Sequence, residues 1–89
     1  MVPKKPEPPA RVTVERVQTG VRMEKRLVKV LKGLAEYKDL SLGDLIEGIC
    51  LHAFEGLAPF SEETMERIED LKRIYGLDLD ASHSHLLDE

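Results

Sequence analysis

The sequence predicts a small, mainly α fold with one short strand near the N-terminus, three helices, and a second copy of the chain that completes the fold. Three observations support this prediction. Apolar and polar residues alternate once, between residues 15 and 23, and apolar residues then recur three times at helical spacing. The single predicted strand has no second strand to pair with. A chain of 89 residues with one cysteine has no internal disulfide, so dimerisation is the expected source of added stability.

The N-terminal residues 1–10 hold four of the five prolines together with two lysines. This composition cannot bury a core, so we expect a disordered, basic arm. A dimerisation and DNA-binding domain is expected over residues 11–56. A C-terminal helix, at about 61–75, and a tail are expected within residues 57–89.

The predicted strand begins near Glu15 and ends at Met23, with a period of two that is typical of a half-buried strand. A lone strand leaves both of its edges unpaired. We therefore expect it to pair antiparallel with the same strand of a second copy, about a two-fold axis. The residues expected to face the helices are Val17, Thr19, Val21 and Met23, and those expected to face outward are Arg16, Gln18, Gly20 and Arg22.

The next two segments are predicted helices. The first follows Met23 and carries one apolar face and many lysines before the short connection Lys38-Asp39. The second begins at Ser41, a good N-cap, with Asp44 three positions later, and ends at Gly56. Its apolar residues lie on more than one face of the helix. We therefore expect another subunit to bury part of this apolar surface. Besides the inward strand residues, the expected dimer core contains Leu31, Leu45, Ile46, Ile49 and Ala53.

The third predicted helix runs from a cap at Ser61 to a stop at Gly76. Phe60 is placed to contact Met65 in a hydrophobic staple across the first turn. Acidic residues occupy the solvent side of this helix. Residues 77–89 have no clear period, and we expect an extended or frayed tail.

Basic and acidic residues are segregated along the chain. Residues 1–38 hold ten Lys/Arg and four Asp/Glu, whereas residues 39–89 hold three and thirteen, so net charges of +6 and −10 make up the total of −4. The basic half can carry an electrostatic footprint for nucleic acid. The acidic half can face another partner or only water.

The order of these elements resembles the ribbon-helix-helix family of DNA-binding proteins. The resemblance rests on Gln18-Thr-Gly-Val-Arg-Met, on Leu27 to Leu34, and on Leu40-Ser-Leu-Gly-Asp-Leu-Ile-Glu-Gly-Ile, and it covers about forty residues. It implies an intertwined homodimer in which two strands, one from each copy, form an antiparallel ribbon. It also implies that the ribbon enters the DNA major groove and that the start of the second helix holds a phosphate.

This resemblance assigns base reading to Arg16, Gln18, Gly20 and Arg22, and phosphate contact to Ser41, Leu42, Gly43 and Lys25. Arginine can bind guanine through two hydrogen bonds, and glutamine can bind adenine in the same way. Gly20 has no side chain to read a base, and two aspartates lie close to the expected phosphate. The expected function is that of a prokaryotic, sequence-specific transcriptional regulator of the repressor type, a homodimer on double-stranded DNA in the cytoplasm, at the nucleoid.

Two alternatives stay open. Many ribbon-helix-helix proteins are antitoxins, in which a C-terminal segment binds a toxin, and the acidic residues 61–89 could bind a protein partner in this way. Alternatively, the chain could keep the dimer fold and lack DNA affinity.

Other chemistries are poorly supported by the sequence. It has no Gly-rich phosphate loop and no Ser/His/Asp arrangement, so we expect no catalysis. Cys50 and His52 are two residues apart on a helix and point away from each other, and we expect neither a metal nor a cofactor. The longest apolar-rich run, Leu45 to Phe54, is too short to span a membrane, and the first residues lack a secretion signal.

Overall fold

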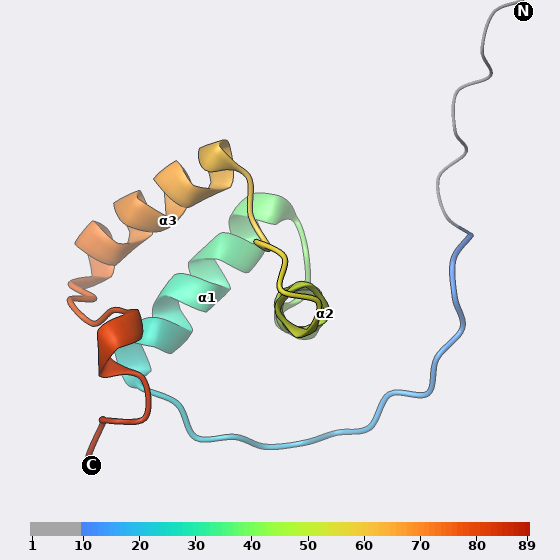
Figure 1. Cartoon of the computed structure of the whole chain (residues 1–89), viewed down its shortest axis with the longest axis horizontal. Helices are drawn as coiled ribbons and strands as arrows, with labels where there is room; N and C mark the ends of the chain where they lie inside the picture. Colours follow the sequence, from blue (N-terminus) through green and yellow to red (C-terminus); the bar gives the residue numbers. More distant parts are fainter. Residues whose placement is uncertain (1–9) are drawn as a thin grey trace, which may run out of the picture.

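The computed structural model describes residues 10–89, in which three α-helices and one turn of 3-10 helix follow an extended segment (Figure 1). The helices are α1 (Lys25–Lys38), α2 (Leu42–Phe54), α3 (Glu62–Tyr75) and η1 (Ala81–His83). α1 and α3 lie side by side, and α2, seen end-on in Figure 1, packs against α1. None of the described helices combines the length and the apolar character needed to cross a membrane.

The predicted strand and its intersubunit ribbon are wrong. Residues 10–24 contain no strand and follow an extended course to the start of α1. The described part of the chain offers no second strand, so the backbone N–H and C=O groups of this segment have no ladder to join. Its apolar side chains also face solvent: Val17 is 78% exposed and Val21 is 73% exposed. Residues 10–89 therefore form a small helical fold without a ribbon. The predicted arm, residues 1–10, lies outside the described residues except for Ala10.

The serine caps predicted for two helices are confirmed. The side-chain oxygen of Ser41 accepts a hydrogen bond from the backbone N–H of Asp44 at 3.1 Å, which starts α2. The hydroxyl of Ser61 does the same for the N–H of Thr64 at 3.2 Å, which starts α3. Each bond satisfies one of the N–H groups that the first turn of a helix leaves without a partner.

All three α-helices end with the same backbone motif, in which a leucine follows a residue in the left-handed conformation. The N–H of each leucine donates to a carbonyl five residues back, which closes the last turn of the helix. Glycine occupies the left-handed position after α2 and α3, but Asp39 occupies it after α1, with φ of 57°. The leucine N–H groups donate as follows: Leu40 to the carbonyl of Ala35 at 2.9 Å, Leu57 to that of His52 at 2.9 Å, and Leu77 to that of Lys72 at 2.8 Å.

The hydrophobic core lies where the three helices meet, and it is small. Its buried residues are Leu34, Ala35 and Leu45, and Val30 is also buried nearby. Five half-buried side chains pack around this centre: Leu31, Ile49, Phe60, Ile68 and Leu71. So few buried apolar residues among those described, 10–89, give this part of the chain little hydrophobic stabilisation.

The residues predicted to form a dimer core divide into two groups. Leu31, Leu45 and Ile49 lie in the core of the single chain. The other group is half-buried or exposed here and comprises Ile46, Ala53, Val17, Thr19, Val21 and Met23.

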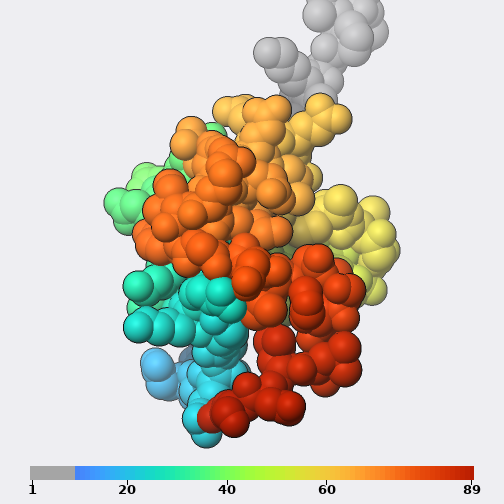
Figure 2. Space-filling view, turned by 90° about the vertical axis from the view of Figure 1, so that its left-hand side faces the viewer, coloured from blue at the N-terminus to red at the C-terminus, as the bar shows by residue number. Residues whose placement is uncertain are grey.

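The C-terminal segment is more ordered than the sequence indicated. It turns back toward the start of α1 after α3, so that α3 and the C-terminal residues cover one face of the molecule (Figure 2). Asp80 caps η1 by accepting the N–H of Ser82 at 2.9 Å, and the Asp80 N–H donates to Nδ1 of His83 at 3.0 Å. The prediction of an extended or frayed tail was therefore wrong for residues 80–83.

Candidate nucleic-acid interface

Arg16, the first predicted base-reading residue, is folded back onto α2. Its Nε donates to Oε2 of Glu47 at 2.9 Å, and its Nη2 donates to Oε1 of the same carboxylate at 2.8 Å. This paired hydrogen bond raises the pKa of Arg16 and lowers the pKa of Glu47. The guanidinium thus presents to Glu47 the same two-donor geometry that would bind guanine.

Arg22, at the other end of the predicted reading surface, forms an ion pair with Glu89 at the C-terminal end of the chain. Gln18 and Gly20 lie between the two arginines, and both are exposed. A Cβ atom added to Gly20 would meet nothing within 4 Å, so packing in the single chain gives no reason for a glycine there. The extended segment therefore carries its polar residues toward solvent, with Arg16 and Arg22 each held by a carboxylate.

The predicted phosphate site at the start of α2 is open to solvent. Ser41 and Gly43 are exposed, and Leu42 is half-buried. The Ser41 hydroxyl is used in the helix cap with Asp44, while the N–H groups of Leu42 and Gly43 belong to the first turn, which has no earlier carbonyl to bond. Such N–H groups, at the positive end of a helix, are suited to an anion.

Lys25 lies far from this helix start. It is the first residue of α1, whereas Ser41 follows the last turn of the same helix. Fourteen residues of α-helix span about 20 Å at ~1.5 Å per residue. The structure therefore does not bring Lys25 and Ser41 together at one phosphate. Lys25, Lys29 and Lys32 are exposed along α1 and offer contacts to phosphates spaced along a duplex.

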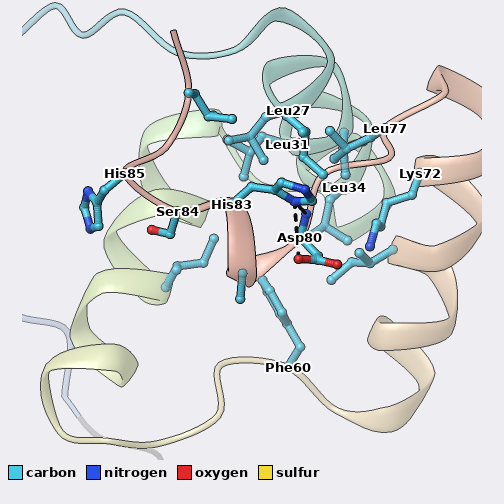
Figure 3. Close-up of a pocket in the computed structure, with 16 residues that line it drawn as sticks. Leu27, Leu31, Leu34, Phe60, Lys72, Leu77, Asp80, His83, Ser84 and His85 are labelled. Atoms are coloured by element: carbon cyan, nitrogen blue, oxygen red, sulfur yellow. Dashed lines mark hydrogen bonds and ion pairs between the residues drawn. The ribbon is translucent and has the colours of Figure 1, made fainter.

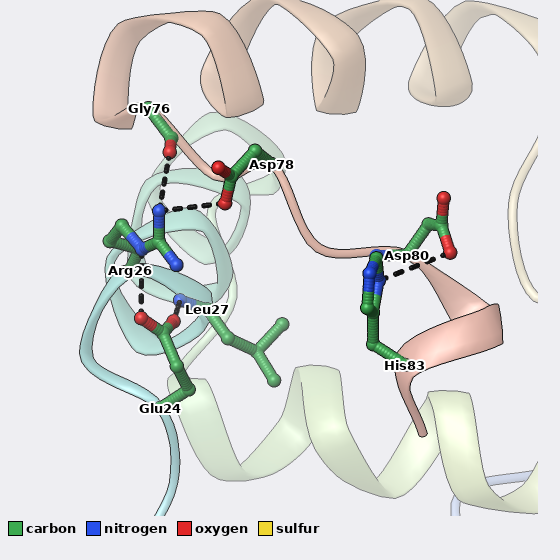
Figure 4. A network of polar contacts seen from close by, with 7 residues as sticks. All are labelled: Glu24, Arg26, Leu27, Gly76, Asp78, Asp80 and His83. Atoms are coloured by element: carbon green, nitrogen blue, oxygen red, sulfur yellow. Dashed lines mark hydrogen bonds and ion pairs between the residues drawn. The ribbon is translucent and has the colours of Figure 1, made fainter. Parts of the chain in front are cut away.

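Arg26 has a structural role that the sequence did not reveal. Its Nε donates to Oε1 of Glu24 at 2.8 Å, and its Nη1 donates to the carbonyl of Gly76 at 2.9 Å and to Oδ1 of Asp78 at 2.8 Å (Figure 4). Glu24 in turn accepts the N–H of Leu27 at 2.7 Å and caps α1. Arg26 thus joins the start of α1 to the end of α3, and it is not available as a DNA contact in this arrangement.

The histidines and the cysteine are not gathered at one place. Among the described residues, no group of three or more His, Cys, Asp or Glu side chains is placed to hold a metal ion. Nδ1 of His52 lies 2.7 Å from the carbonyl oxygen of Gly48, so it acts as a donor within α2. Cys50 is half-buried on the same helix.

Comparison of the chain with protein-family models, with curated proteins and with solved structures found no match. The proposals below therefore rest on the geometry and the charges of the described residues.

Proposed function

We propose that the chain is a sequence-specific DNA-binding regulator that acts as a homodimer in the cytoplasm, at the nucleoid. One observation carries this proposal: apart from Arg26, the described arginines and lysines of the basic half, together with Gln18, are exposed on one extended segment and on α1. The acidic residues are concentrated instead on α3 and after it. A basic surface of this kind attracts the phosphate backbone of DNA, whereas an acidic surface is repelled by it. The basic side of the protein is therefore the side that faces the DNA.

The extended segment, residues 10–24, contacts DNA in this proposal as an arm and not as a ribbon. Side chains two residues apart on an extended chain are about 6.6 Å apart, close to two base-pair steps of ~3.4 Å. Arg16 and Gln18 have this spacing and Arg22 lies four residues beyond Gln18. All three have the hydrogen-bonding groups that recognise guanine and adenine. DNA binding requires Arg16 to leave Glu47 and Arg22 to leave Glu89. Both ion pairs are exposed, so releasing them costs little.

Phosphate contacts supply the part of the affinity that does not depend on base sequence. The lysines of α1 and the N–H groups at the start of α2 are the candidates, at opposite ends of one helix. Asp39 and Asp44 reduce the attraction at the α2 end. We therefore assign the larger share of this affinity to Lys25, Lys29 and Lys32.

The test starts from sheared bacterial DNA, from which the fragments that the protein retains are sequenced. Binding to the selected fragment is then measured by gel shift at several salt concentrations. We expect log K to fall linearly with log salt, and Arg22→Ala to weaken binding and reduce discrimination against unrelated DNA. Arg73→Ala is the matched control because Arg73 is an exposed arginine on α3, also in an ion pair. Binding that is indifferent to both salt and Arg22→Ala would contradict the proposal.

A second candidate function, binding of a protein partner through residues 61–89, is favoured by exposed apolar side chains in that region. Ile74 is 70% exposed and Leu86 is 72% exposed. Against it, α3 already packs on α1 in the single chain. A toxin encoded beside this protein, together with loss of toxin binding in Ile74→Asp but not in Arg22→Ala, would favour this function over DNA binding alone.

A further inference from the structure

The C-terminal end of α2 presents an apolar surface to solvent. Leu51 is 66% exposed, Phe54 is 84% exposed and Leu57 is 55% exposed. We call these three residues the α2 knob. α2 packs against α1 and, in the part of the chain that is described, makes no helix contact with α3, so nothing in the single chain covers the knob. A cluster of large apolar side chains this exposed is typical of a binding surface.

A mainly apolar pocket lies on the same chain, between α1, α2, α3 and the C-terminal segment (Figure 3). Its volume is about 460 Å³, within the range of about 300–1,000 Å³ that is typical of binding pockets. Leu27 and Leu31 line it from α1, as Figure 3 shows, and the imidazole of His83 lies close to them. Ile49 lines it from α2, and Leu79 lines it from the C-terminal segment. This volume can accept an aromatic side chain together with a leucine.

The knob of a chain cannot fill the pocket of that same chain. Ile49 already lines the pocket, and Phe54 lies five residues further along the same helix. At ~100° per residue, Phe54 is therefore rotated by roughly 140° from Ile49 around the axis of α2. A rigid helix that faces the pocket with Ile49 thus directs Phe54 elsewhere. Knob and pocket are complementary only between two chains.

We propose that two copies of this chain associate about a two-fold axis, so that the α2 knob of each copy fills the pocket of the other. A two-fold axis makes this contact twice and leaves no knob or pocket unfilled, whereas an open chain of copies would leave one of each at its ends. This inference rests on the homodimer of the proposed function and identifies the surfaces that form it.

Gly48 supports a close approach of the second copy beside the knob. It lies three residues before Leu51, on the adjoining surface of α2, and a Cβ atom there would meet nothing within 4 Å in the single chain. A glycine inside a helix lowers helix stability relative to alanine, and packing within the chain does not require it. Contact with the second copy accounts for it, because a glycine lets another chain approach the helix backbone.

The first test measures the molar mass in solution, by light scattering after size-exclusion chromatography, over a range of protein concentrations. We expect the wild type to be a dimer and Phe54→Asp to be a monomer, with the dimer dissociation constant raised by at least about 100-fold. Phe54 is exposed in the single chain, so circular dichroism should show that the variant retains its helices.

Ile74→Asp is the matched control, because Ile74 is an exposed apolar residue outside the knob and the pocket. This variant should remain a dimer. A Phe54→Asp variant that dimerises as the wild type does, or a wild type that forms larger assemblies, would overturn the proposal.

The second test uses cross-linking and reports which residues of the two copies approach each other. In a Cys50→Ser background, a copy with Phe54→Cys is mixed with a differently tagged copy with Leu79→Cys and oxidised. We expect the mixed disulfide between the two copies to form faster than with Glu66→Cys, an exposed position on α3, in place of Leu79→Cys. Equal rates would overturn the knob-and-pocket arrangement. If DNA binding persists in that case, the interface alone is wrong; if the disulfide forms but no DNA is bound, the proposed function is wrong.

Discussion

Arg16 and Glu47 join the extended segment to α2 through two parallel hydrogen bonds, at 2.9 and 2.8 Å. They are 31 residues apart in the sequence. The Arg16 side chain is 67% exposed and the Glu47 side chain is 44% exposed. Together with the pairing of Arg22 and Glu89, this contact means that the free protein holds both arginines against carboxylates of its own chain. In the proposed complex, DNA would compete with those carboxylates for the two arginines.

Glu47→Gln is therefore expected to strengthen DNA binding. The substitution removes the negative charge that holds Arg16 and leaves the size of the side chain nearly unchanged, so more molecules have a free guanidinium. We expect an affinity gain of about two- to fivefold, the range associated with exposed ion pairs. Fluorescence anisotropy on the selected DNA fragment measures it.

Glu55→Gln is the matched control for that gain, because it removes the same charge from the end of the same helix. It should produce a smaller change, due only to the altered net charge. If both variants gain equally, the effect is general electrostatics and the contact with Arg16 has no part in it.

Gly33 is expected to resist substitution because α3 passes close to it. A Cβ atom on Gly33 would lie 2.9 Å from Cδ2 of Leu71, which is closer than packed carbon atoms approach. Gly33→Val places two further methyl groups there and should lower the free energy of unfolding by about 1–3 kcal/mol. Chemical denaturation followed by circular dichroism measures this loss.

A double-mutant cycle tests the cause of that loss. Leu71→Ala removes the nearest atoms that valine would meet and leaves the looser contact with Tyr75 at 3.7 Å. Gly33→Val should therefore cost less in the Leu71→Ala background than in the wild type. An equal cost in both backgrounds would show that helix propensity, and not the contact between α1 and α3, makes valine unfavourable at this position.

The helices could be predicted from the sequence because their signals are local. Ser41 and Ser61 form caps with residues three positions later, and Gly76 adopts the left-handed conformation that glycine favours. Each of these features involves residues within one turn of each other. A single sequence contains all the information that such a contact needs.

The strand and the network around Arg26 could not be predicted in this way. Alternation between residues 15 and 23 indicates which side chains would share a face, but it does not supply the second strand that a ladder requires. Arg26 contacts Asp78, 52 residues later, and Glu24 is not among the preferred capping residues. Arg16 was recognised as a functional candidate, but its contact with Glu47 was missed for the same reason: long-range partners have no local signature.

The cap of α1 by Glu24 should make the stability of the protein depend on pH in the acidic range. The hydrogen bond from Arg26, and then the bond from the N–H of Leu27, lower the pKa of Glu24 below its ordinary value of 4.5. A carboxyl group with a lowered pKa in the folded state stabilises the fold above the unfolded pKa, and this stabilisation is lost as the pH falls through the folded pKa. Glu24→Gln should therefore lower Tm at pH 7, and the difference from the wild type should shrink as the pH falls below 4.5. Thermal unfolding at pH 7, 5 and 3 checks this expectation, and a constant difference would contradict it.

Asp39→Gly is expected to stabilise the protein. Asp39 ends α1 with φ of 57°, in the left-handed region that costs residues with a Cβ atom about 1 kcal/mol relative to glycine. Its carboxylate also lies at the negative end of the α1 dipole. The substitution should raise the free energy of unfolding by about 0.5–1 kcal/mol, after allowance for the greater freedom of glycine in the unfolded chain.

The reverse change at the equivalent position after α3 is Gly76→Ala, where φ is 66°. It should lower the free energy of unfolding by about 1 kcal/mol. Urea denaturation of both variants tests the pair: a loss of stability in Asp39→Gly would mean that the aspartate side chain contributes more than its backbone conformation costs.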